Sequence, residues 1–71
     1  MNTKAQTAAA FLAAFNAAQA AYKNPATASE RAALSAALDR AMVAYRKAHR
    51  MSDACGFLDL ISHYNATYAT A

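Results

Sequence analysis

Alanine is the commonest residue in this chain of 71 residues, which contains a single glycine and a single proline. Alanine has the highest helix propensity, because it loses no side-chain entropy in a helix and has no polar group that competes with the backbone. Glycine and proline, which most disfavour a helix interior, are nearly absent. The sequence therefore predicts an all-α fold, and we expect residues 1–71 to form a single helical domain.

Three segments carry apolar residues at the three- and four-residue spacing of an amphipathic helix. We expect helices over about 3–23, 28–50 and 53–68. The short connections favour antiparallel neighbours, either in an up-down-up bundle or in a helical hairpin with a third helix laid across it. The expected apolar stripes are Ala8, Phe11, Leu12, Phe15, Ala18 and Tyr22 in the first helix, Leu34, Leu38, Ala41, Met42, Tyr45 and His49 in the second, and Phe57, Leu58, Ile61, Tyr64 and Tyr68 in the third.

The helix boundaries are predicted from capping signals. Asn24-Pro25 ends the first helix, because proline has no N–H to donate and the residue before it disfavours the α-conformation. Thr27 and Glu30 have the spacing of a capping box, which marks the start of the second helix. Ser52 is the expected N-cap of the third helix, with Asp53 in its first turn.

The small size of the chain favours self-association. A domain of this length buries only about 60% of its unfolded surface, and a single cysteine cannot form an intrachain disulfide. Alanines such as Ala13 and Ala17 line the side of the first helix opposite Phe15. They can simply favour helix formation, or they can let a second helix approach closely. We expect a homodimer, with Ala13, Ala17, Tyr64 and Tyr68 as interface candidates.

The second helix carries cations away from its Leu34 and Leu38 stripe. The candidate partner-binding residues are Arg40, Val43, Arg46, Lys47 and Arg50. A solvated helix face would explain the charges, but not a valine among them. Arginine is enriched at protein-binding hot spots, so the alternative is a docking surface for an acidic partner. The net charge of +3 permits such a partner without requiring one.

Candidate catalytic groups are weak. Cys55, Asp59 and His63 are spaced to share one side of the third helix, but the helical rise would separate Cys55 from His63 by about 12 Å. A nucleophile and its base need hydrogen-bond contact, so we expect an Asp59–His63 surface pair and no enzyme activity. The chain lacks the Cys and His clusters of structural zinc sites, and we expect neither metal nor cofactor.

The beginning of the chain resembles a signal peptide, with a lysine, an apolar run and the tripeptide Ala18-Gln19-Ala20. The run is short, consists mostly of alanine and is broken by Asn16. No run approaches the ~20 apolar residues of a membrane span. We therefore expect a cytoplasmic protein that does not associate with membranes.

These features favour a small protein-binding regulator, adaptor or inhibitor. Alanine-rich helical chains of this size are common among accessory proteins of GC-rich bacteria and their phages, so a phage-encoded inhibitor of a host protein is one form of this hypothesis. The alternative is a nucleic-acid-binding transcriptional regulator that uses the second and third helices. A recognition helix should carry base-reading side chains near its N-terminus, whereas residues 52–59 are acidic and apolar, which disfavours the alternative.

Overall fold

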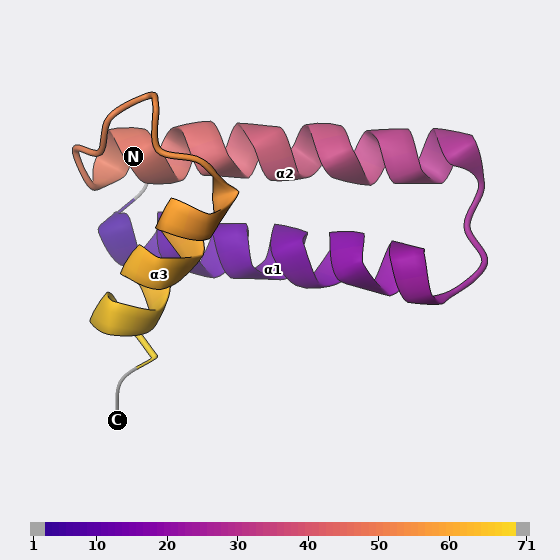
Figure 1. The fold of residues 1–71 in the computed structure, drawn as a ribbon, viewed down its shortest axis with the longest axis horizontal. Coiled ribbons are helices and arrows are strands. Elements are labelled where there is room, and N and C mark those ends of the chain that lie inside the picture. The colour runs from indigo at the N-terminus through magenta and orange to yellow at the C-terminus, as the bar shows by residue number, and fades with distance from the viewer. Residues whose placement is uncertain (1–2, 70–71) are drawn as a thin grey trace.

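The computed structural model describes residues 3–69, which form three α-helices and no strand. Helix α1 spans Lys4–Lys23, α2 spans Ala28–Ala48 and α3 spans Phe57–Thr67. The first two helices lie side by side and antiparallel, and α3 crosses one end of this hairpin at a steep angle (Figure 1). The predicted all-α fold is confirmed, with the third helix laid across a helical hairpin. Within the described residues, no helix combines the length and the apolar character needed to cross a bilayer.

Each long helix begins with a complete capping box. The predicted box of α2 is confirmed: the Thr27 hydroxyl accepts from the Glu30 N–H at 3.0 Å, and the Glu30 carboxylate accepts from the Thr27 N–H at 3.3 Å. Thr3 and Gln6 form the same pair at the start of α1, at 3.1 and 2.8 Å. Both boxes satisfy backbone donors that the first helical turn leaves without intrahelical partners.

The C-terminus of α2 ends in a Schellman motif centred on Arg50. The Met51 N–H donates to the Arg46 carbonyl at 2.9 Å, and the Arg50 N–H points at the Lys47 carbonyl at 3.4 Å. Arg50 has a φ of 56°, in the left-handed region that glycine adopts most easily. This residue therefore turns the chain away from α2, at a local cost that glycine would avoid.

The third helix begins four residues later than predicted. Ser52 does not cap it: its hydroxyl accepts from the Ala54 N–H at 3.1 Å, in a turn closed by the Cys55 N–H and the Ser52 carbonyl. Gly56 is the N-cap, and because glycine has no side chain, only the Asp59 carboxylate completes the cap, accepting from the Gly56 N–H at 2.9 Å. The long connection carries the chain from the end of α2 across to α1, which a helix starting at Asp53 would not do.

The core lies where α3 meets the hairpin. Its large, fully buried side chains are Phe11, Tyr45 and Leu60, one from each helix, with Ala8 beside them. Phe57 packs its ring against Phe11 and Phe15, with centroids 6.2 and 5.0 Å apart. These contacts seat the first turn of α3 on α1.

The apolar stripe predicted for α3 is right at Phe57, Ile61 and Tyr64 and wrong at one residue. Leu58, which we expected in the core, is 78% exposed, whereas Leu60 is fully buried and was missed. The buried face starts at Phe57 and continues through Leu60, Ile61 and Tyr64. Because this set also has helical spacing, periodicity alone could not choose between the two stripes.

Candidate functional site

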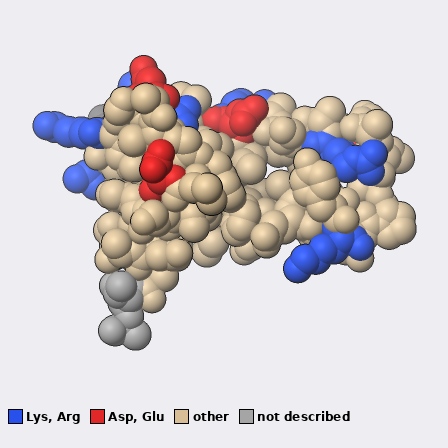
Figure 2. Space-filling model, viewed as in Figure 1, with Lys and Arg blue, Asp and Glu red and all other residues tan. Residues whose placement is uncertain are grey.

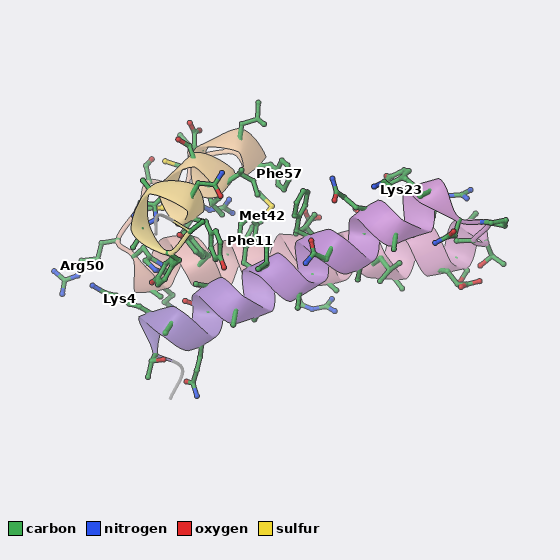
Figure 3. All side chains as sticks on the ribbon, turned by 90° about the horizontal axis from the view of Figure 1, so that it is seen from below. Lys4, Phe11, Lys23, Met42, Arg50 and Phe57 are labelled. Atoms are coloured by element: carbon green, nitrogen blue, oxygen red, sulfur yellow. The ribbon has the colours of Figure 1, made fainter. Side chains whose placement is uncertain are left out.

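Three of the predicted partner-binding residues lie exposed along one side of α2, and a fourth, Arg50, lies exposed just beyond its end. Arg40, Val43, Lys47 and Arg50 are all exposed, with Val43 at 56%, and we call this set the basic face. Arg50 and Lys4 extend from the same end of the molecule, so α1 adds a cation that was not predicted (Figure 3). A basic side chain at the start of α1 gives no signal in the sequence, because its closeness to Arg50 depends on the hairpin.

Arg46 is placed differently from the basic face. It is half-buried, and its Nη1 donates to the Cys55 carbonyl at 3.1 Å. Its Nε is buried without a hydrogen-bond partner among the described residues. Arg46 thus ties the end of α2 to the connection before α3, which gives it a structural contact that the sequence did not indicate.

A cluster of tyrosines and histidines joins α2 to α3. The Tyr45 hydroxyl lies 2.6 Å from His63 Nδ1, and the Tyr68 hydroxyl lies 2.6 Å from His49 Nε2. The rings of Tyr45 and His49 stack at 4.0 Å, and those of the two histidines meet edge to face at 5.1 Å. Tyr64 stacks obliquely on Tyr68 at 5.4 Å. We call these five residues the Tyr–His cluster.

The hydrogen-bond partners indicate which atoms of this cluster donate and which accept. His49 Nδ1 lies 2.9 Å from the Tyr45 carbonyl, which can only accept, so Nδ1 carries the proton. In the neutral ring Nε2 is then an acceptor, and the Tyr68 hydroxyl donates to it. The buried Tyr45 hydroxyl donates to His63 Nδ1, since a buried donor without an acceptor costs about 1 to 3 kcal/mol.

Burial raises the pKa of Tyr45 from its ordinary 10.0 to about 12, and the nearby Tyr68 and Tyr64 hydroxyls add to the effect. Tyr45 therefore stays protonated at neutral pH and remains a hydrogen-bond donor. A raised pKa disfavours the phenolate, so this hydroxyl is poorly suited to act as a base. The cluster is organised as a structural connection between helices.

The expected alignment of Cys55, Asp59 and His63 is wrong. Cys55 lies in the connection before α3, where it packs against the core and remains a free thiol. Asp59 caps the start of α3, and His63 is half-buried against Tyr45. The expected Asp59–His63 surface pair is therefore replaced by two separate interactions, because packing turns His63 toward α2.

The four tyrosines all belong to the expected apolar stripes, with Tyr64 and Tyr68 also expected at an interface, and they have different environments. Tyr45 is fully buried, Tyr64 is half-buried, and Tyr68 is at the edge of the Tyr–His cluster with 36% exposed. Tyr22 is 79% exposed, so the prediction was wrong for this residue. The other interface candidates, Ala13 and Ala17, lie exposed on α1.

The described residues contain no group of three His, Cys, Asp or Glu side chains that could hold a metal ion. Comparison of the chain with protein-family models, with curated proteins and with solved structures finds no match. The basic face and the Tyr–His cluster are therefore interpreted from their own geometry.

Proposed function

We propose that this chain is a small, non-catalytic, cytoplasmic regulator that docks an acidic surface of another protein through the basic face of α2. The face presents three cations around one exposed valine, and Lys4 extends from the same end of the molecule. Apolar contact at the centre and cations at the rim are the usual composition of a protein-binding surface. The single free thiol fits a reducing compartment.

The observation that carries the proposal is the backbone of Arg50. Its φ of 56° places it where glycine is strongly preferred at the end of a helix. A non-glycine residue in this conformation costs about 1 kcal/mol or more. A cation held at such a position supports a role in binding, because strained residues cluster at functional sites.

The geometry supports a protein partner better than duplex DNA. The helix-turn-helix motif joins its two helices by a turn of three or four residues, whereas residues 49–56 separate α2 from α3. Asp59 lies in the first turn of α3, where a recognition helix would face the phosphates or base edges. A transcriptional regulator therefore remains the alternative that the experiment below would reveal.

Arg50→Gly separates stability from binding. We expect the variant to be as stable as the wild type or up to about 1 kcal/mol more stable, because glycine relieves the positive φ. We expect it to bind the partner at least severalfold more weakly, because the cation is gone. Thermal unfolding measures the first quantity, and titration calorimetry with the isolated partner measures the second.

The partner is identified with three immobilised baits: the wild type, Arg40/Lys47/Arg50→Glu, and Ala17→Glu as a control that adds a carboxylate at an exposed position of α1 outside the basic face. The proposal expects a protein that the wild type and the control retain and that the triple variant loses. Retention by all three baits would contradict the proposal. Binding of labelled duplex DNA that weakens steeply with salt, and is lost in the triple variant, would favour the nucleic-acid alternative.

A further inference from the structure

An apolar groove lies beside α3, on the part of the hairpin that α3 leaves uncovered. It is lined by Phe15, Ala18, Gln19 and Tyr22 of α1, Leu38 of α2 and Phe57 of α3. The surface that these residues expose in the groove is apolar. The floor of the groove continues the apolar stripes of α1 and α2 that form the core. The groove is therefore an extension of the core, and no segment among residues 3–69 fills it.

The groove continues toward the end of the hairpin that α3 does not reach. A second hollow shares Ala18, Tyr22 and Leu38 with it, and adds Leu34 and Arg31. Helix α1 is about 30 Å long and α3 only about 16 Å, so α3 cannot cover both ends of the hairpin. The uncovered length exposes Tyr22 to 79%, and aromatic rings contribute most of the energy at protein interfaces.

Asp59 and two cations lie at opposite ends of this apolar strip, with Glu30 beside the cations and Lys4 and Arg50 further out at the α3 end. Asp59 lies exposed in the first turn of α3, two residues after Phe57 of the groove. At the other end, Arg31 lines the second hollow and Lys23 ends α1. Figure 2 shows acidic side chains over α3, over the adjacent loop and over the middle of α2, and basic side chains at the far end of the hairpin as well as at the outer edge of the end where α3 lies.

We infer that the groove is covered by the same groove of a second copy of this chain, related to it by a two-fold axis. A two-fold axis that lies in the interface and runs across the strip places the α3 end of one copy against the far end of the other. Asp59 of each copy would then face Arg31 and Lys23 of its partner, while Tyr22 and Phe15 pack across the apolar middle. In this arrangement the apolar middle packs on itself, and Asp59 is opposite in charge to the two cations that it faces.

The size of the core favours a second copy as the occupant. The described residues bury only three large side chains completely, Phe11, Tyr45 and Leu60. A domain of this length is marginally stable alone, and association is one of the common remedies. A partner that is bound permanently stabilises such a domain better than one that binds only under some conditions. A second copy of the chain is present wherever the chain is made. The inference keeps the homodimer expected from the sequence but moves its interface from Ala13, Ala17, Tyr64 and Tyr68 to the groove, and it does not depend on the basic face.

Sedimentation of the purified full chain tests the inference with two matched variants. Tyr22→Glu and Ala17→Glu each place a carboxylate at an exposed position of α1, the first in the groove and the second outside the groove lining. We expect the wild type and Ala17→Glu to sediment as dimers at micromolar concentrations, and Tyr22→Glu to be monomeric. Circular dichroism confirms that each variant remains helical. Should Tyr22→Glu lose its helical signal, Tyr22→Ala replaces it with the same expectation of weaker dimerisation.

The charge arrangement is tested with Lys23→Glu. Two symmetry-related pairs are changed at once, so we expect the dimer dissociation constant to rise about three- to tenfold at low salt, with a smaller change at high salt. A wild-type chain that is monomeric throughout the series would overturn the inference. A dimer that Ala17→Glu abolishes and Tyr22→Glu leaves intact would also overturn it, and would assign the interface to the alanine side of α1. Neither result depends on an external partner, so the proposal for the basic face is tested separately.

Discussion

The two halves of the hairpin carry the same apolar stripes in different environments. In the half beneath α3, Phe11 and Tyr45 are fully buried and the Tyr–His cluster connects α2 to α3. In the other half, the same stripes continue as Leu34, Leu38 and Tyr22, none of which is fully buried. The difference shows that an amphipathic stripe determines which side of a helix can be buried. How much of that side is buried depends on the position of a third helix, α3.

The largest expected loss of stability comes from a substitution in the half of the hairpin that α3 covers. Phe11→Ala removes a fully buried ring, and we expect a loss of about 3 to 5 kcal/mol in the free energy of unfolding. This loss is a large part of the stability of so small a domain, so the variant should be partly unfolded at room temperature. Urea denaturation followed by circular dichroism measures it.

The controls for Phe11→Ala are substitutions of exposed apolar residues. Tyr22→Ala and Leu58→Ala should each change the free energy of unfolding by less than about 0.5 kcal/mol in dilute solution. A loss at Tyr22 as large as that at Phe11 would show that the two halves are equally packed.

The covered half also predicts a response to alkaline pH. Burial raises the pKa of Tyr45 from 10.0 to about 12, whereas the unfolded chain keeps the ordinary value. Between these values the unfolded state releases the proton first, so the stabilising effect of the protonated hydroxyl is present below pH 10 and is lost as the pH rises toward 12. The expected loss is on the order of 2 to 3 kcal/mol.

Tyr45→Phe is the control for this pH dependence. It removes the titrating hydroxyl and the hydrogen bond to His63, so stability at neutral pH should fall by about 1 kcal/mol. In this variant the free energy of unfolding should decrease less between pH 10 and 12 than in the wild type, because Tyr45 no longer contributes to the loss. Identical alkaline profiles for the two proteins would contradict the assignment of this effect to Tyr45.

The smallest expected changes in the free energy of unfolding come from removing the threonine of each capping box. Thr3 starts α1 in the covered half, and Thr27 starts α2 in the uncovered half. Each Thr→Ala substitution should cost its helix about 1 kcal/mol. We expect Thr3→Ala to lower the free energy of global unfolding by that amount, and Thr27→Ala by less, because the uncovered end opens before the whole chain unfolds.

Hydrogen exchange of backbone amides measures the difference between the caps. Thr27→Ala should accelerate exchange in the first turns of α2, and the acceleration should diminish at concentrations where a second copy covers this end. Equal effects of the two substitutions on global stability would show that the hairpin unfolds as one unit.

The parts that could be predicted are those that depend on neighbouring residues. Asn24-Pro25 ends α1 through proline chemistry, and Thr27 with Glu30 begins α2 through side chains three residues apart. The exposed positions of Arg40 and Lys47 followed from helical spacing on a single element. The start of α3 was missed because Ser52 and Asp53 also satisfy the local rules for a cap, and packing decided against them.

The sequence by itself determined that this protein is helical, where its two long helices begin and which of their sides are apolar, because these properties arise from residues within a turn or two of one another. Only the tertiary structure decided that Leu60 rather than Leu58 enters the core, that His63 bonds to Tyr45, and that Tyr22 stays exposed. These outcomes depend on where α3 lies across the hairpin. That position is set by contacts between residues far apart in the chain, such as Phe57 on Phe11, whose pairing no local pattern records.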